Sequence, residues 1–297
     1  MGHKGWTKEL HIMSKLRLMF QNQWYTIHNN SSWEEKGLDC SAKVRMRGHF
    51  RVLKELMPDV LGGQEVNWDM QRYLKFYCSE EKLPYTMIWG NDTLILYRSD
   101  KLNLLDSEFL LYPGYVEGYE GSFNNNFTKS FNLAVFQCKE DGKIFILATT
   151  HLWFKNGTDP THRSYQAGSD QVRRIQVEMA IDIIEKYRKK YSGSPIIFGG
   201  DFNSLYHSEA IQYALSERGF VHAHDVAVES ASEDRGMNDL KGDHPGNLWL
   251  EGGFSAAIDH ILVRDIPQNS VLRFERYMTE DYLVLSDHAP VYVDMNI

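Results

Sequence analysis

The chain has few cysteines, few prolines and no long hydrophobic run, and each shortage excludes a class of protein. Its three cysteines, Cys40, Cys78 and Cys138, lie far apart without metal-type spacing, so neither a disulfide framework nor a structural zinc site is expected. The longest apolar stretches, such as residues 144–148, are about five residues long, whereas a membrane-spanning helix needs roughly 20. The composition therefore excludes a membrane span, a fibre and a disordered chain.

Basic residues are also in short supply, with 32 Lys and Arg against 40 Asp and Glu and a formal charge of −8. Acidic surfaces repel phosphate backbones, so a broad basic cradle for nucleic acid is not expected, although a local basic pocket is compatible with this balance. Residues 1–12 contain no apolar signal segment, and we interpret them as an N-terminal extension or a remnant of cloning. We expect a cytoplasmic protein.

Short apolar runs rich in β-forming residues recur along the chain and predict largely buried strands. They lie at residues 16–20, 60–61, 93–97, 133–137, 144–148, 196–198, 257–263 and 291–295. Helical spacing predicts helices over 42–57, 172–187 and 208–219. Strands and helices mixed in this way indicate an α/β or α+β fold, and the absence of a linker or repeat indicates one domain.

Polar residues suited to metal binding or acid–base chemistry follow these runs. Taken singly, each has a simpler explanation, because an Asp or Asn after a strand usually forms a turn and an isolated His is more often packed or solvated. However, strand-end loops of a rigid sheet are where sites are normally built, and independent turns would not be expected to combine in this way. The residues are Asn22, Glu65, His151, Asp201, Asn203, Asp259, Asp287 and His288.

In the order of these motifs the sequence resembles the endonuclease/exonuclease/phosphatase superfamily over nearly the whole chain. The motifs are FQNQ, GQEV, TTHLW, GDFNS, IDHIL and SDHAP, and GDFNS followed by SDHAP is a specific signal. TTHLWF followed by VRRIQ is most similar to the deadenylase and nocturnin branch. The resemblance implies a phosphoester hydrolase whose catalytic domain, residues 13–297, is a four-layer αββα sandwich of two mixed sheets flanked by helices.

Carboxylates gathered in one cleft require a compensating cation. Two like charges 4 Å apart repel by about 4 kcal/mol at an effective dielectric constant near 20. Carboxylate and amide oxygens without thiolates suit Mg²⁺ or Mn²⁺. By resemblance, Glu65, Asn22 and Asp287 would hold this ion, Asp201 would orient or deprotonate the attacking water, and Asn203 would position that water or the phosphate.

The remaining motif residues are expected to contact the scissile phosphate. Asp259 would hydrogen-bond His288 and favour its protonated form, and His151 would face the same phosphate as a donor. In an extended segment Asp287 and His288 would point to opposite sides, one toward metal and the other toward phosphate. Alternation would aim His260 away from Asp259, so we interpret His260 as a packing residue, with support of the site's own residues as the less favoured alternative. Which of the two imidazoles is acid and which is base stays open.

Several further residues are candidates for substrate binding. Arg173 and Gln176 match a recurrent family pattern on the predicted helix, but they equally fit a polar helix face tied to the sheet edge. Residues 112–129 form the longest apparent loop and a candidate lid, from which Lys129 and Asn132 would face phosphate.

Aromatic residues near the motif loops could stack on a base or line a pocket, although core or rim packing is the commoner role of any one of them. They are Trp68, Trp153, Phe154, Trp249 and Phe254. His222 and His224 have zinc-compatible spacing without an obvious third ligand, which favours a solvated loop.

The sequence therefore predicts a metal-dependent phosphoester hydrolase, a phosphodiesterase or phosphatase, that uses in-line attack of water without a covalent intermediate. The expected substrate is a nucleotide, an oligonucleotide 3′ end or a small phosphorylated metabolite, with no membrane and no obligate protein partner. A catalytically silent binding module is the alternative from another class, but it should show substitutions among the ligands, and every position is filled. Sphingomyelinase-like action is disfavoured because no export signal or apolar insertion hairpin is found.

Overall fold

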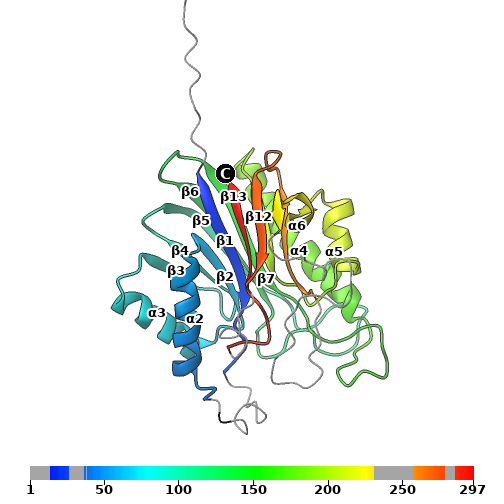
Figure 1. Ribbon diagram of the computed structural model, residues 1–297. Helices are drawn as coiled ribbons and strands as arrows, with labels where there is room; N and C mark the ends of the chain where they lie inside the picture. Colours follow the sequence, from blue (N-terminus) through cyan, green and yellow to red (C-terminus); the bar gives the residue numbers. More distant parts are fainter. Residues whose placement is uncertain (1–13, 27–36, 38, 231–256, 278–284) are drawn as a thin grey trace, which may run out of the picture.

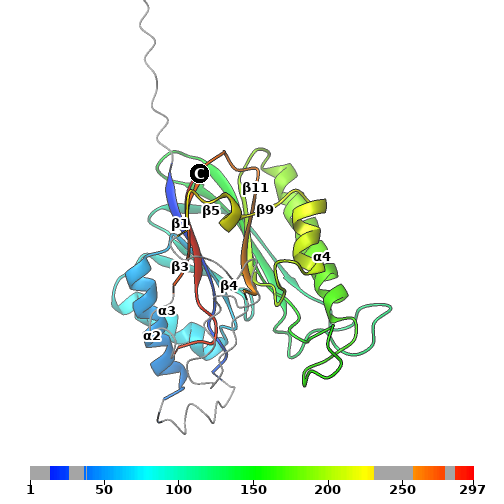
Figure 2. The same ribbon diagram turned by 45° about the vertical axis from the view of Figure 1, so that its right-hand side comes forward.

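The computed structural model describes residues 14–26, 37, 39–230, 257–277 and 285–297. Two mixed β-sheets pack face to face, and helices lie on their outer faces (Figures 1 and 2). This arrangement confirms the expected four-layer sandwich. Among the described residues, no helix is both long and apolar enough to span a bilayer.

The first sheet has seven strands in the order β10-β12-β13-β1-β2-β4-β3. They are β1 (Lys15–Asn22), β2 (Val60–Gln64), β3 (Tyr85–Ile88), β4 (Leu94–Arg98), β10 (Glu229–Ser230), β12 (Val271–Arg276) and β13 (Val291–Asn296). The second sheet has six strands in the order β5-β6-β7-β8-β11-β9. They are β5 (Leu102–Leu111), β6 (Ser130–Cys138), β7 (Ile144–His151), β8 (Ile196–Asp201), β9 (Val221–His222) and β11 (Asp259–Arg264). Each sheet has a parallel pair, β1 with β2 and β7 with β8, whose carboxyl ends lie together.

Helices cover the outer face of each sheet (Figure 2). The first sheet carries α2 (Ala42–Leu56) and α3 (Trp68–Glu80). The second carries α4 (Ser169–Lys190) and α5 (Glu209–Gln212), which continues as a π-helical turn (Tyr213–Glu217), while α6 (Ala223–Val226) is a single turn after β9. The predicted stop of α2 before Pro58 is confirmed, because Met57 adopts a left-handed conformation and caps the helix.

Strands near the middle of the second sheet are buried on both faces. In β7, Phe145 and Leu147 pack into the core between the two sheets, while Ile146 and Ala148 pack toward α4. This double burial explains why the strand is continuously apolar in sequence rather than alternating.

Glycines allow the two sheets to approach each other near the site. A Cβ atom on Gly62 of β2 would lie 2.7 Å from Thr149 Oγ1 of β7, and one on Gly199 of β8 would lie 2.7 Å from the ring of Phe20. Because such contacts are too close for a side chain, only glycine lets the ends of these strands meet at this spacing.

The predicted strands and the two longer predicted helices are all found, and α4 is longer at both ends than predicted. The third predicted helix is interrupted, since only 209–212 is α-helical before the π-helical turn. Residues 112–129 contain no regular element, as predicted. The sequence pattern did not predict the helices α3 and α6 or the strands β3, β5, β9, β10 and β12. Of these strands, β3, β5, β9 and β10 lie at sheet edges, and β9 and β10 have only two residues each.

Candidate active site

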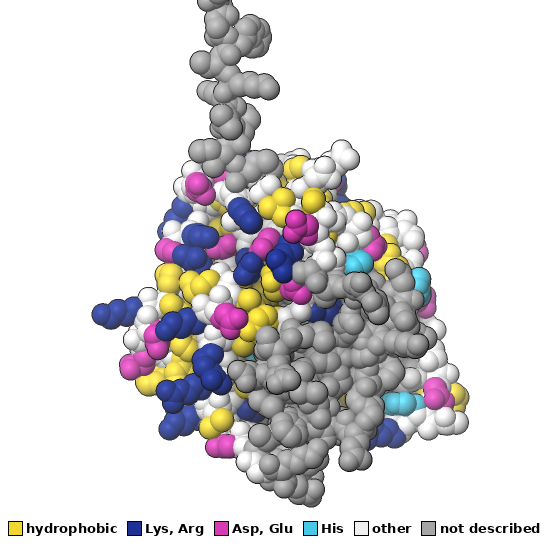
Figure 3. All heavy atoms as spheres, in the orientation of Figure 1, with side chains coloured by type: hydrophobic (Ala, Val, Ile, Leu, Met, Phe, Trp, Pro, Cys, Tyr) yellow, Lys and Arg dark blue, Asp and Glu magenta, His cyan; other side chains and the backbone are white. Residues whose placement is uncertain are grey.

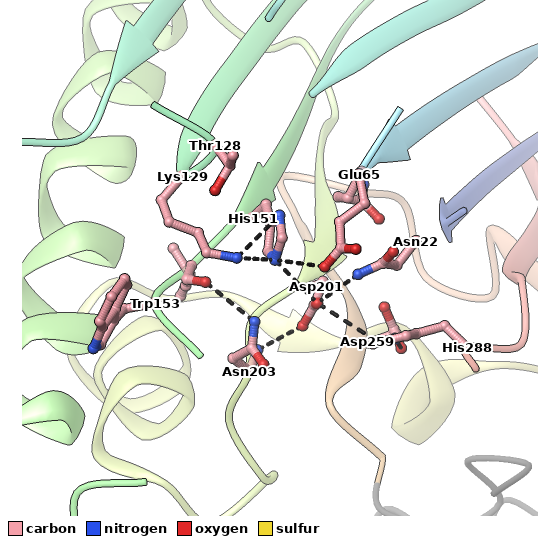
Figure 4. A network of polar contacts seen from close by, with 12 residues as sticks. Asn22, Glu65, Thr128, Lys129, His151, Trp153, Asp201, Asn203, Asp259 and His288 are labelled. Atoms are coloured by element: carbon pink, nitrogen blue, oxygen red, sulfur yellow. Dashed lines mark hydrogen bonds and ion pairs between the residues drawn. The ribbon is translucent and has the colours of Figure 1, made fainter. Parts of the chain in front are cut away.

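Side chains from both sheets meet at the carboxyl ends of the parallel strands (Figure 4). The register aligns Asn22 of β1 with Gln64 of β2, and it aligns both His151 of β7 and Asp259 of β11 with Asp201 of β8. Strand pairing therefore brings together residues that are up to about 240 positions apart in the sequence.

Asp201 is the centre of this group and is 1% exposed. One carboxylate oxygen accepts a hydrogen bond from Asn22 Nδ2 at 2.9 Å, and the other accepts from the backbone N–H of Asn203 at 2.8 Å. Asn203 has φ 47°, a left-handed conformation that turns the chain back toward the carboxylate. Burial, reinforced by the charge of Asp259, raises the pKa of Asp201 to about 6.

On one side of Asp201, His288 forms a buried ion pair. Its Nδ1 lies 2.7 Å from Asp259 Oδ2, and its Nε2 lies 3.9 Å from Asp201 Oδ2. Burial alone lowers the pKa of His288, but the carboxylates of Asp259 and Asp201 outweigh burial and hold the pKa well above its usual value. The predicted Asp259–His288 hydrogen bond is present, and the raised pKa agrees with the expected protonated imidazole.

On the other side of Asp201, the amine of Lys129 lies 2.5 Å from His151 Nε2. His151 Nε2 is also 3.4 Å from Asp201 Oδ2. Burial and the neighbouring charge of Lys129 hold the pKa of His151 well below its usual value. Burial also lowers the pKa of Lys129, while the charges of Glu65 and Asp201 oppose this effect. The lowered pKa of His151 agrees with a neutral imidazole that accepts a hydrogen bond from the amine of Lys129.

Glu65 and Asp287 add two more carboxylates. Glu65 Oε2 accepts from the backbone N–H of Tyr25 at 3.1 Å, and Glu65 Oε1 lies 3.6 Å from His151 Nε2. Asp287 Oδ1 is buried and has no hydrogen-bond partner among the described residues. Such an orphaned buried carboxylate oxygen fits a site that takes a cation.

The charges of the group support the same conclusion. The group contains four carboxyl side chains, of Glu65, Asp201, Asp259 and Asp287, but only two side chains that can carry positive charge close to them, Lys129 and His288. A divalent cation would compensate this surplus of acidic groups. Oxygen and imidazole ligand atoms lie within 4.8 Å of one another in the trio Glu65, His151 and Asp201. These residues therefore fit a hard divalent cation such as Mg²⁺ or Mn²⁺.

Two expectations for the motif residues need correction. The segment that holds Asp287 and His288 is a turn rather than an extended strand, so the two side chains do not point to opposite sides; Asp287 Oδ1 is 4.0 Å from His288 Nε2. Asn22 lies in the group as predicted, but its amide nitrogen faces Asp201 and its oxygen accepts from the backbone N–H of Trp24. Asn22 thus orients Asp201 directly.

Three of the predicted substrate-binding residues lie beneath the site instead of facing it. Arg173 Nη1 donates to the carbonyl oxygens of Trp153 and Lys155, and Gln176 Oε1 accepts from the backbone N–H of Trp153. Trp153 itself is fully buried. Two roles were open for Arg173 and Gln176. The structure favours the one that links α4 to the sheet edge, because both side chains form hydrogen bonds with the backbone of the segment that follows His151.

Asn132 is also structural, since its Nδ2 donates to the carbonyl oxygens of Trp89 and Thr93. Among the aromatic candidates, Trp68 and Phe154 are exposed, whereas Trp249 and Phe254 lie outside the described residues. Lys129 is the one predicted substrate-binding residue whose charged group reaches the cluster (Figure 4).

The sequence reasoning missed Arg45, which holds the segment carrying Asp287 and His288. Arg45 is 2% exposed, and it donates to Leu285 O at 2.6 Å and to the carbonyl oxygens of Gln23 and Trp24 at 2.6 and 2.7 Å. The sequence did contain a signal for this role, because Arg45 occupies an inward-facing position of the amphipathic helix α2, where a charged residue is rarely found without buried partners.

The match to known proteins agrees with this geometry. Residues 50–288 match the sequence profile described as the Endonuclease/Exonuclease/phosphatase family. The chain belongs to this family. Members of this family are hydrolases that act on phosphoester bonds.

Individual relatives are more distant. The chain is 31% identical over 192 residues to Protein angel of Drosophila melanogaster, which covers 60% of this chain, and the chain spans 48% of that relative. Among solved structures, a family member from Bacteroides thetaiotaomicron aligns with a TM-score of 0.68 at 17% identity, over 97% of this chain and 96% of that one. The human nocturnin catalytic domain, solved with a sulfate anion, aligns with a TM-score of 0.61 at 18% identity, over 96% and 95% of the two chains. At these identities the structural likeness establishes the fold alone.

Proposed function

We propose that this family member hydrolyses a nucleotide or the 3′ end of a short oligonucleotide by metal-assisted, in-line attack of water on phosphorus, with no covalent intermediate. The observation that carries the mechanism is the buried group around Asp201, in which carboxylates outnumber cations. A divalent ion bound there would polarise a non-bridging phosphate oxygen and stabilise the leaving group.

Asp201 and the side chains around it would activate the water, stabilise negative charge on the phosphate and hold the ion. Asp201, held by Asn22 and Asn203, accepts the proton of the attacking water, because its pKa of about 6 leaves it ionised and basic at neutral pH. The imidazolium of His288 and the ammonium of Lys129 flank Asp201 and donate to phosphate oxygens as negative charge develops. Glu65, with Asp287, holds the ion.

Two exposed tryptophans support a substrate with an aromatic base. Trp68 and Trp89 are 63% and 52% exposed, and their rings lie 5.2 Å apart in an edge-to-face arrangement. Trp68 begins α3, three residues after Glu65 in the sequence. An exposed aromatic pair is suited to stacking on a nucleobase.

The surface charge favours a short substrate over a long duplex. On the face shown in Figure 3, Lys and Arg side chains of the described residues are interspersed with Asp and Glu and form no continuous basic stripe. Together with the net charge of −8, this distribution would give weak attraction to a long phosphate backbone.

The reaction is tested with bis-p-nitrophenyl phosphate and p-nitrophenyl phosphate in Mg²⁺, in Mn²⁺ and in EDTA. We expect turnover in either metal and none in EDTA, together with a rise in melting temperature on addition of millimolar Mg²⁺. No turnover with any metal, an unchanged melting curve and no heat of Mg²⁺ binding would contradict the mechanism.

The substrate is tested with a panel of nucleotides, short RNA and DNA, inositol phosphates and sugar phosphates. We expect the highest kcat/KM on a substrate with a base, and we expect Trp68→Ala with Trp89→Ala to raise its KM without changing turnover of p-nitrophenyl phosphate. Phe76→Ala is the matched control, since Phe76 is an exposed aromatic residue of the same helix outside this pair. A preference for sugar phosphates would contradict the proposed substrate but not the reaction.

A further inference from the structure

A second group of buried histidines lies behind the catalytic loop. His222 of β9 and His260 of β11 are 1% and 0% exposed, and their rings are enclosed by the rings of Phe202, Tyr206 and Phe274. The sequence pattern assigned His222 to a solvated loop and His260 to packing. The burial of His222 contradicts the first expectation, and both rings make hydrogen bonds of defined direction.

The partners of the two rings determine which nitrogen carries each proton. His222 Nδ1 accepts from the backbone N–H of His224 at 3.1 Å, so its proton is on Nε2. His222 Nε2 lies 3.2 Å from His260 Nδ1, and His260 Nε2 lies 2.7 Å from the carbonyl oxygen of Ser204. Because a carbonyl can only accept, His260 donates from Nε2 and accepts at Nδ1.

The result is one continuous chain of hydrogen bonds from the start of α6 to the loop after β8. It runs from the backbone N–H of His224 through His222 and His260 to Ser204 O, and both rings are neutral with the proton on Nε2. Burial, with a smaller contribution from the nearby guanidinium of Arg276, holds the pKa of His222 well below its usual value, which agrees with a neutral ring.

The far end of this chain is attached to the catalytic loop. Ser204 follows Asn203, whose left-handed backbone turns its N–H onto Asp201. His260 follows Asp259 in β11, and side chains of successive strand residues point to opposite faces of a sheet. His260 therefore lies on the face of β11 opposite to the one from which Asp259 reaches the site.

We propose that His222 and His260 are positioning residues, which fix the loop of Asp201 and Asn203 through the Ser204 carbonyl and thereby set the geometry of water activation. Neither imidazole touches the reacting atoms. Without the His260 donor, the Ser204 carbonyl would lose this hydrogen bond and the loop could shift. A small displacement of a catalytic group lowers the rate of the chemical step more than it weakens substrate binding.

The test compares two substitutions of His260 with different hydrogen-bonding ability. His260→Phe keeps an aromatic ring in the cavity but cannot donate to Ser204 O, whereas the amide nitrogen of His260→Gln can take the place of Nε2. We expect His260→Phe to lower kcat about 10- to 100-fold with KM within about twofold, and His260→Gln to recover most of the loss. His222→Phe should give a smaller loss, since it removes only the outer link of the chain.

His224→Ala is the matched control, because it removes a neighbouring imidazole while the backbone N–H that His222 accepts is retained. We expect wild-type kcat in this variant. The folded fraction of every variant is checked by thermal melting and by Mg²⁺ calorimetry. A wild-type kcat in His260→Phe, or a loss equal to the unfolded fraction, would overturn the proposal.

A second measurement does not depend on a substrate. Long-range ¹H–¹⁵N spectra at pH 7 should show His222 and His260, assigned through the two variants, as neutral rings protonated at Nε2. In His260→Phe the backbone amide signals of residues 201–204 should shift, while they should stay in place in His224→Ala. An Nδ1-protonated or imidazolium form of either ring would overturn the proposal, whatever the enzyme's substrate proves to be.

Discussion

His151 and His288 flank the same carboxylate and are both buried, yet they are held in opposite charge states. Their Nε2 atoms lie 3.4 and 3.9 Å from Asp201 Oδ2. Burial lowers the pKa of both rings, so burial cannot explain the difference. His288 has the carboxylate of Asp259 at Nδ1 and is protonated, whereas His151 has the amine of Lys129 at Nε2 and is neutral.

The two halves of the site supply positive charge through different groups. The half built by β11 and the turn after residue 285 supplies an imidazolium fixed by a carboxylate, and the half built by β6 and β7 supplies an ammonium fixed by an imidazole. Both halves direct positive charge toward Asp201, as a site that stabilises an anionic transition state requires. The partner of each histidine, rather than its burial, decides which group is the cation.

Removal of Asp201 should have the largest effect, since both halves act on this carboxylate. We expect Asp201→Ala to lower kcat by about 10³-fold or more, because Asp201 is the carboxylate proposed to accept the proton of the attacking water. Steady-state kinetics measures the loss, and calorimetry should show that Mg²⁺ binding largely persists. Full activity in this variant would rule out Asp201 as the water-activating group.

Breaking the Asp259–His288 pair should have the next largest effect. We expect Asp259→Asn to lower kcat on the order of 10²-fold and to move the alkaline limb of the pH–rate profile to lower pH, because the pKa of His288 falls when its carboxylate partner is lost. An unshifted alkaline limb would show that the charge of His288 is not used.

The same substitution should change the pH dependence of stability. The pKa of His288 is raised in the folded protein above a usual value of 6.5, so its contribution to stability is complete below that value and is lost as pH rises through the higher folded pKa. We therefore expect Asp259→Asn to reduce the melting temperature more at pH 6 than at high pH. An equal reduction at both pH values would contradict the charged pair.

Removing the cation of the other half should cost less. We expect Lys129→Met to lower kcat/KM by about tenfold and to raise the pKa of His151, because the neighbouring charge that depresses that pKa is gone. Lys129→Arg, which keeps the charge, is the control. Histidine titration by NMR checks the shift, and a fall in the pKa of His151 would contradict the assignment of Lys129 as the cation.

The residues beneath the site should affect stability and leave catalysis intact. We expect Gln176→Leu to cost about 1–3 kcal/mol of unfolding free energy, since the backbone N–H of Trp153 would be buried without a partner. Chemical denaturation measures this cost. A large rise in KM at full folding would instead restore the predicted contact between Gln176 and substrate.

Much of the fold was predictable because its central strands are buried on both faces and therefore form continuous apolar runs, as β7 and β8 do. The edge strands β3 and β5 were missed because they are only partly buried and their patterns are weak. Among site residues, the structural role of Asn132 was missed and that of Gln176 was left as one of two alternatives, since a polar residue in sequence does not reveal whether its partner is substrate or the backbone.

The sequence by itself determined the family, because its motifs occur in the order and spacing of that family over most of the chain, and through that resemblance it predicted the reaction class. Only the tertiary structure decided the charge of each group and its task. Charge states depend on the nearest partners in space. The partners of His151 and His260 come from neighbouring strands of the second sheet, whereas Asp201 and His288 have partners that reach them only when the two sheets pack together.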